Sequence, residues 1–487
     1  MIRVTAKALA LIFLARAAIA EPSADPQYLV FWLTGSVLQT SAEIKGRLIE
    51  SSMQAFANAG GDPGELQPLA QHIQESMKAN NFAEAEATMD RILAIQRRRI
   101  GGPDSALPSF DSSEIDKGVA DLVARIGTTG DGNARKLGFG LAIPTFILEK
   151  QIPDIIKAAF RVARERDVAV HFSFDSQNFW QNRADLWKNP ENVEWSDWNG
   201  TPNAARVLDW GEPQKLAPHM CYNSPAILRE IARIVKEGIG PALAVELAAL
   251  RDAKKEYLFA GITVGSEPAI DDYTQIAALD PNQAAFMDRE GLPQVRLGYH
   301  ALTNLGFGPE NPPKDFKREL ANVNRDFIIY WSRQFVEAGV PATRLYTHVP
   351  AQGIDFGDLP VDYSNAPASI AFIPYARPGW TTYPVGRLER DFKPLYALLE
   401  AHGSPAWGGV EANAGLGPSP VDWGEYLARH FRHGARLVGV NVGASSPALE
   451  GQLTQSAYGP EAIAAYRAFF SGKLSQRSWP ENFEPGG

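Results

Sequence analysis

The clearest pattern in the sequence is an alternation of short apolar runs with longer amphipathic segments. LGFGLAIP (137–144) and VAVHFSFD (168–175) are typical of buried strands, and 148–167 between them carries apolar residues at the three- and four-residue spacing of a helix. The same alternation recurs toward the C-terminus. Repeated strand–helix units predict parallel strands joined by right-handed crossovers.

The number of strands selects the architecture. An apolar run, YLVFWLT, comes before seven further strand-like runs, and eight parallel strands predict a (β/α)₈ TIM barrel with long loops at the carboxyl ends of its strands. In chain order, the predicted strands cover 28–34, 137–144, 168–175, 258–267, 343–349, 369–374, 405–411 and 436–442.

Two alternatives to this arrangement stay open. The first is an open doubly wound sheet, but no G-x-G-x-x-G motif follows any predicted strand. In the second, the run at 28–34 belongs to a helical N-terminal module, the barrel begins at 137–144, and one strand is hidden near 204–210.

The N-terminal quarter has a different character from the barrel. Ala-, Glu- and Met-rich residues at helical spacing cover 41–97, and 101–135 is rich in Gly, Pro, Asp and Ser. We therefore expect an N-terminal segment over 21–135, with a first strand and a helical insertion, then the barrel over 136–475 and a tail over 476–487. Whether the helices elaborate the first crossover or form a separate module stays open.

The first twenty residues have the pattern of an export signal. Arg3 and Lys7 precede a short apolar run at 8–14, and Ala18-Ile19-Ala20 supplies a small-x-small cleavage site. The alternatives are a first helix of the mature fold or a membrane anchor, but the run falls short of the ~20 apolar residues that span a bilayer. We expect a signal peptide over 1–20, a secreted, periplasmic protein, and no integral membrane segment after cleavage.

Composition excludes several classes of protein. With 45% apolar and 21% charged residues the chain is an ordinary globular protein, which excludes general disorder. A net charge of -9 without a long Lys/Arg run argues against a nucleic-acid partner. The single cysteine, Cys221, excludes an internal disulfide and a multi-cysteine metal site. We expect neither a metal nor a cofactor, and the sequence does not set the oligomeric state.

Candidate chemistry gathers where the predicted strands end, because barrel enzymes build their sites there. Glu267 in GITVGSEP and Glu411 in WGGVEANAG directly follow apolar strands. Of two such carboxyl groups, one can act as a general acid and the other as an ionised nucleophile. Cleavage of a glycoside with retention requires the two groups to lie ~5–5.5 Å apart. The structural alternatives are an acid at the start of a turn or helix for Glu267 and a carboxylate bound to loop amides for Glu411.

These residues resemble the clan of retaining glycoside hydrolases on (β/α)₈ barrels, in which glutamates end strands 4 and 7. The resemblance implies Glu267 as acid/base and Glu411 as nucleophile, and Pro268 matches the Asn-Glu-Pro often found there. It also implies that Tyr375, at the end of the sixth strand, hydrogen-bonds the nucleophile. Ser266 departs from the clan's usual Asn, which contacts the sugar 2-hydroxyl. A short side chain there suits a substrate substituted or linked at O2.

The loop at 176–222 holds five of the chain's eleven tryptophans. Loops of this length are normally functional, and aromatic faces beside polar groups suit sugar rings, although the tryptophans could instead form a satellite core. His171 lies on one strand face with Asp175, but denser metal-ligand spacings are missing. The predicted substrate-binding residues are Asp175, Trp180, Ser266, Tyr299, His300, His348, Arg377, Trp380, Trp407 and Asn441.

The function predicted from the sequence is a secreted retaining glycoside hydrolase. It would cleave a β-linked glycoside or oligosaccharide by double displacement, and it would transglycosylate when the acceptor is another sugar. The alternative from another class is a non-catalytic periplasmic carbohydrate-binding barrel. A third interpretation is an enzyme that acts on a non-sugar polar substrate such as a polyol.

Overall fold

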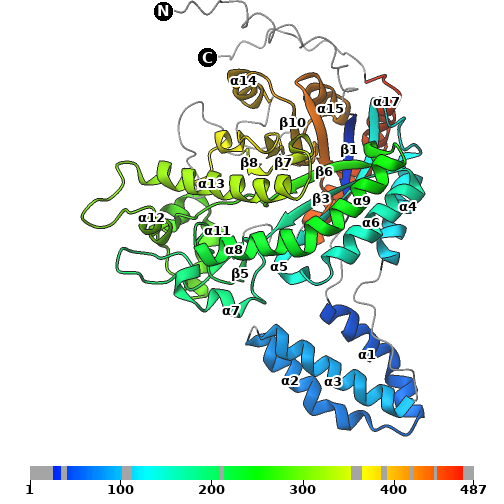
Figure 1. Ribbon diagram of the computed structural model, residues 1–487, viewed down its shortest axis with the longest axis vertical. Helices are drawn as coiled ribbons and strands as arrows, with labels where there is room; N and C mark the ends of the chain where they lie inside the picture. The colour runs from blue at the N-terminus through cyan, green and yellow to red at the C-terminus, as the bar shows by residue number, and fades with distance from the viewer. Residues whose placement is uncertain are drawn as a thin grey trace, which may run out of the picture.

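In the computed structural model, parallel strands form a barrel with helices around it (Figure 1). The barrel strands are β1(Gln27–Trp32), β2(Arg135–Pro144), β3(Ala169–Asp175), β6(Phe259–Val264), β7(Leu345–Thr347), β8(Val349–Pro350), β9(Gly379–Thr381), β10(Trp407–Ala412) and β11(Ala435–Val440). The structure describes residues 26–33, 41–79, 81–100, 112–208, 213–351, 365–384, 392–416, 420–443 and 447–474.

The order of the strands closes the sheet into a ring. The order is β7-β6-β3-β2-β1-β11-β10-β9-β8, and every neighbouring pair in this sheet is parallel. β7 and β8 are separated by one residue, His348, so the same short segment pairs with β6 on one side and β9 on the other. The predicted (β/α)₈ barrel is confirmed, with Gln27–Trp32 as its first strand.

Closure decides between the predicted alternatives. An open doubly wound sheet is wrong, because its two edge strands would not meet. The strand suggested near 204–210 is also not part of the barrel: β4(Arg206–Leu208) pairs antiparallel with β5(Gln214–Leu216) in a separate two-stranded sheet.

The prediction for the sixth strand was wrong. The segment predicted as a strand over 369–374 instead forms a 3-10 turn at Ala368–Ala371 and a tight turn closed by a bridge between Ile373 and Ala376. The sixth strand is β9, which begins at Gly379. The apolar residues at the start of this segment are buried as expected, but Pro374 has no amide hydrogen to give to a ladder.

Alternating side chains divide the core into two parts. Phe31 faces outward from β1 and packs on the rings of Tyr458 and Tyr466 from the surrounding helices. Tyr28 and Val30, three and one positions before Phe31 and therefore on the other face of the strand, belong to a separate buried cluster that fills the barrel interior. The helices around the strands include α4(Ser113–Ile126), α6(Ile152–Arg166), α8(Pro225–Ile234), α9(Gly240–Asp252), α13(Phe316–Glu337), α14(Lys393–Ala401), α15(Trp423–Arg432), α16(Pro447–Tyr458) and α17(Pro460–Phe470).

Three helices follow β1 and lie together at one end of the molecule in Figure 1. They are α1(Ser41–Asn58), α2(Gln67–Lys78) and α3(Phe82–Ile100). Phe56, Leu66 and Ile92 form a small buried cluster of their own, distinct from the barrel core. Within the ranges that the structure describes, no helix is long and apolar enough to cross a membrane.

Two long loops pack on one another beyond the carboxyl ends of β3 and β6. The loop after β3 carries α7(Ala184–Trp187) and the β4–β5 pair, and the loop after β6 carries α10(Ile276–Leu279), α11(Pro281–Arg289) and α12(Tyr299–Asn304). The rings of Trp195 and His300 stack 3.9 Å apart, and Asn223 donates to the Ala301 carbonyl. These loops therefore form one layer over part of the barrel mouth.

Candidate active site

Polar side chains from five successive strands meet at the carboxyl end of the barrel. Glu267 follows β6, His348 lies between β7 and β8, Thr381 ends β9, Glu411 lies in β10, and Asn441 follows β11. The chain order makes these strands four to eight of the barrel. The structure thus brings together four residues predicted from the sequence, with Thr381 as an addition.

Glu411 is held by two donors on the same carboxylate oxygen. The Tyr383 hydroxyl donates to Oε1 over 2.5 Å, and Asn441 Nδ2 donates to the same atom over 3.2 Å and to the Tyr383 oxygen over 2.7 Å. Burial raises the pKa of Glu411, and the charge of Glu267 adds to the rise, whereas His348, Tyr383 and Asn441 oppose it. The side chain keeps 30% exposure, so Glu411 remains open to a ligand.

Glu267 is presented by a left-handed turn. Its backbone φ is 51°, and Gly265 two residues earlier has a φ of 73°. A left-handed conformation costs a non-glycine residue about 1–3 kcal/mol, and the following Pro268 restricts it further. The Thr381 hydroxyl donates to Glu267 Oε1. Strain of this kind is typical of functional sites, where the surrounding structure maintains it.

His348 connects the two carboxylates. Its Nε2 lies 3.7 Å from Glu267 Oε1, 3.5 Å from Glu411 Oε2 and 2.9 Å from Thr381 Oγ1. Burial lowers the pKa of His348, although the charge of Glu411 opposes this, so the ring is neutral near pH 7. Because the Thr381 hydroxyl donates to Glu267, its oxygen is free to accept the Nε2–H of His348.

Two further predicted residues lie beside Glu267 on its β3 side. Asp175, the last residue of β3, accepts hydrogen bonds from the backbone and side-chain nitrogens of Asn178, and burial raises the pKa of Asp175 to about 6. The backbone carbonyl of Ser266 accepts from the amides of Gln177 and Asn178. Both residues therefore belong to the wall that supports Glu267.

Three tryptophans predicted to bind substrate are core residues instead. Trp180, Trp380 and Trp407 are 0% exposed, and each donates its indole N–H to a backbone carbonyl. Their predicted role is wrong, because the large apolar surface that suits a sugar face suits burial equally well. Of the other tryptophans in the loop at 176–222, Trp187, Trp195 and Trp198 are half-buried, and Trp210 lies outside the described residues.

Tyr299 and His300 pack the loop layer. His300 is 2% exposed, donates from Nδ1 to the Val193 carbonyl over 2.8 Å, and stacks on Trp195. Tyr299 is half-buried and meets the edge of Trp198. The contacts of both residues are therefore with other residues of the loop layer.

Tyr375 and Arg377 were predicted at the carboxyl end of the sixth strand, and this prediction was wrong. Both precede β9, so they lie at its amino end, where Arg377 donates to the Tyr346 hydroxyl over 3.3 Å. Tyr383 is the tyrosine that binds Glu411. The signal in the sequence that could have identified Tyr383 is the alternation of side chains along a strand. If the sixth strand is taken to start at residue 379, this alternation puts Thr381 and Tyr383 on the same face.

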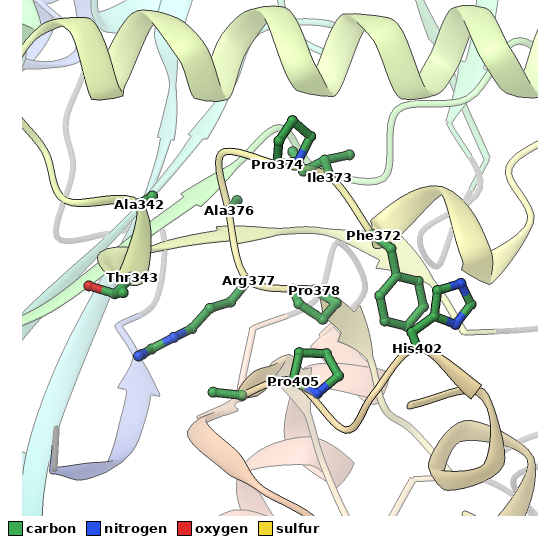
Figure 2. Close-up of a pocket in the computed structure, with 11 residues that line it drawn as sticks. Ala342, Thr343, Phe372, Ile373, Pro374, Ala376, Arg377, Pro378, His402 and Pro405 are labelled. Carbon is green, nitrogen blue, oxygen red and sulfur yellow. The ribbon is translucent and has the colours of Figure 1, made fainter. Parts of the chain in front are cut away.

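A recess of about 600 Å³ opens at this same amino end (Figure 2). Phe372 and His402 stack face to face at 3.7 Å along one side of it, and the side chain of Arg377 extends from the turn that includes Pro374. The eleven lining residues include no carboxylate. Glu267 and Glu411 lie at the opposite, carboxyl end of the barrel strands.

Within the described part of the chain, no group of three or more His, Cys, Asp or Glu side chains is arranged to hold a metal ion. The carboxylates and His348 instead bind to hydroxyl and amide groups of the protein. Two carboxylates with different hydrogen-bond partners are suited to proton transfer and to nucleophilic attack by a carboxylate.

Compared by sequence, the chain matches no protein-family model and no curated protein. In structure it is similar to the catalytic domain of a β-amylase from Paenibacillus polymyxa, at 9% identity over 77% of this chain and 97% of that chain, with a TM-score of 0.45. It is also similar to a GH20 exo-β-N-acetylglucosaminidase from Vibrio harveyi, at 10% identity over 74% of this chain and 52% of that chain, with a TM-score of 0.37.

A chitobiase from Flavobacterium johnsoniae is similar too, at 11% identity over 75% of this chain and 48% of that chain, with a TM-score of 0.34. The chain thus spans about half the length of these last two proteins. The solved structures that it resembles include glycosidases, but at these identities the activity has to be derived from the residues.

Proposed function

We propose that this protein is a glycoside hydrolase that cleaves a β-linked glycoside with retention of configuration. The observation that carries the proposal is that Glu267 and Glu411, from the fourth and seventh strands, both approach one buried nitrogen, His348 Nε2. The strand positions match the clan that the sequence resembles. Two carboxyls that approach one another in this way are what glycoside cleavage by an acid and a nucleophile requires.

The surroundings of each glutamate support a division of roles. Tyr383 and Asn441 hold Glu411 Oε1, which leaves Oε2 on the side of His348 and Glu267. Glu411 Oε2 attacks the anomeric carbon, the bond to the leaving oxygen breaks, and Glu267 gives that oxygen its proton. Glu267 then takes a proton from water, or from a sugar hydroxyl in transglycosylation, as the incoming oxygen displaces Glu411.

The contacts to His348 also limit how far apart the acids lie. Glu267 Oε1 and Glu411 Oε2 are separated by no more than the sum of their distances to Nε2, which are 3.7 Å and 3.5 Å. This limit falls well short of the upper end of the ~6.5–9.5 Å range of inverting enzymes. It leaves room for the ~5–5.5 Å that retention requires.

A panel of aryl β-glycosides and natural disaccharides tests the proposal, with the first-formed anomer identified by proton NMR. We expect turnover of at least one β-glycoside and a β-configured first product. An α-configured first product would indicate inversion.

The same panel distinguishes the alternatives. Binding of a sugar without turnover would favour the carbohydrate-binding barrel, and turnover of polyol derivatives alone would favour an enzyme with a non-sugar substrate. Best activity on glycosides without an O2 substituent would contradict the preference inferred from Ser266.

We also propose that the protein is exported to the periplasm after removal of its first twenty residues. The support is the charged start, the apolar run and the cleavage site before Glu21. These residues lie outside the described part of the structure. The mass of the protein recovered from a periplasmic extract is expected to match a chain that begins at Glu21. A recovered chain that retains residues 1–20 would contradict the proposal.

Tyr383→Phe is expected to shift the acidic limb of the kcat/KM profile to higher pH by about one unit. The Tyr383 hydrogen bond lowers the pKa of Glu411, so its loss raises that pKa. A nucleophile must be ionised, so activity disappears at a higher pH as the solution is acidified. Tyr375→Phe, the same substitution at the opposite end of the barrel, is the control and should leave the profile unchanged. An unshifted limb in Tyr383→Phe would contradict the role of this hydrogen bond.

A further inference from the structure

The turn that presents Glu267 departs from ordinary backbone preferences at two positions. Gly265 and Glu267 both have left-handed φ angles, 73° and 51°, and Pro268 follows directly. Glycine tolerates this conformation, whereas a glutamate before a proline does not favour it. Contacts from elsewhere in the chain must therefore hold the turn in place.

The carbonyl in the middle of this turn accepts two side-chain hydrogen bonds. Gln177 Nε2 lies 2.5 Å from the Ser266 oxygen, and Asn178 Nδ2 lies 3.1 Å from it. Both side chains are 1% exposed and come from the loop after β3. A carbonyl oxygen has two lone pairs, and here both are bound by buried amides. We call this pair, Gln177 and Asn178, the amide clamp.

The orientation of the clamp is itself fixed by charged groups. Asn178 Nδ2 also donates to Asp175 Oδ2 over 3.0 Å, and Asn178 Oδ1 accepts from the Arg206 guanidinium. Arg206 is paired with Asp271, which lies in the loop after β6. Because its oxygen is committed to Arg206, Asn178 presents its two amide hydrogens to Asp175 and Ser266 and cannot flip.

We propose that Gln177 and Asn178 are positioning residues for Glu267. By holding the Ser266 carbonyl they maintain the left-handed turn and so direct the Glu267 carboxylate toward Thr381 and His348. This inference rests on the proposed function, in which Glu267 is the acid/base. The clamp acts on Glu267 through the Ser266 carbonyl, so its effect is transmitted through the backbone of residues 265–267.

This arrangement predicts a selective defect rather than a general one. A displaced Glu267 still leaves Glu411 and its partners in place, so attack on the anomeric carbon continues. Protonation of the leaving oxygen becomes less efficient, which lowers kcat/KM for a substrate with a basic leaving group such as methoxyphenol. A dinitrophenol departs without a proton, so its release does not need Glu267. Because kcat/KM reports only the steps up to release of the phenol, the two aryl glycosides separate these effects.

Gln177→Met tests the proposal, because methionine keeps the length of the side chain and removes the donor. On the sugar that the substrate panel selects, kcat/KM for the methoxyphenyl glycoside is expected to fall about 10- to 100-fold, as expected for a misplaced catalytic group. The value for the dinitrophenyl glycoside should change little. Asn178→Ala retains the Gln177 bond and should show a smaller loss with the same selectivity.

The matched control is Asn182→Leu. Asn182 lies in the same loop and also donates to a backbone carbonyl, that of Phe146, over 2.8 Å. Any loss in this variant should be equal for both glycosides. An equal loss for both glycosides in Gln177→Met and Asn178→Ala, or no loss in either, would overturn the positioning role. Glu267→Gln must itself show the selective loss; if it does not, the proposed role of Glu267 fails, and that failure is separate from the clamp.

Discussion

Glu411→Ala is expected to lower kcat by several orders of magnitude on every glycoside that the protein cleaves. The side chain supplies the oxygen that displaces the leaving group, and no other carboxylate in the cluster stands in its place. Tyr383 and Asn441 would remain, so the vacated space keeps donors that bind an anion. Added azide should therefore restore part of the turnover and give the α-glycosyl azide.

Glu400→Ala is the control for this substitution, because Glu400 is an exposed glutamate at the end of α14. It should retain wild-type turnover, and both variants should unfold at similar temperatures. Unchanged turnover in Glu411→Ala would contradict the mechanism. An azide product of β configuration would contradict the assignment of Glu411 as the attacking group.

Glu267→Ala should reduce kcat/KM by about 10²- to 10⁴-fold for glycosides with basic leaving groups, and by far less for activated ones. The alkaline limb of the kcat/KM profile, where a general acid loses its proton, should flatten. Azide should accelerate turnover of the glycosyl-enzyme and give the β-glycosyl azide, because Glu411 remains to form the intermediate. The α-azide from Glu267→Ala would reverse the two assignments.

Glu337→Ala serves as the matched control, since Glu337 is the last residue of α13 and lies on the outside of the barrel. It should leave the leaving-group dependence and the pH profile as in the wild type. Equal losses of Glu267→Ala for all leaving groups would show that the glutamate supports the fold rather than proton transfer.

The fold was predictable because its signals are local. Strand-length apolar runs between amphipathic helices specify a parallel sheet, and the direction of parallel strands places Glu267 and Glu411 at the same end. The sixth strand was misplaced because the apolar residues Ala368, Ile370 and Ala371 are buried without joining the sheet. That shift led to Tyr375 instead of Tyr383 as the partner of Glu411.

The remaining features depend on contacts between distant parts of the chain. The left-handed turn at Glu267 depends on an amide 89 positions away, Gln177, and nothing in GSEP reveals it. Trp180 gives its indole hydrogen to the carbonyl of Pro218, and composition alone does not separate such packing from sugar binding. Sequence patterns located Glu267 and Glu411, whereas contacts such as that of Gln177 with Ser266 and that of Tyr383 with Glu411 appear only when the chain is folded.

The division of the fifth strand at His348 has a consequence for folding. The segment before it pairs with β6 and the segment after it pairs with β9, so this residue lies at one of the two places where the halves of the ring join, the other being the β1–β11 pair. Glu267 belongs to the first half and Glu411 to the second. Neither half contains both glutamates, so the proposed activity requires the joined ring. During refolding, this activity should therefore return only after the helical signal has recovered.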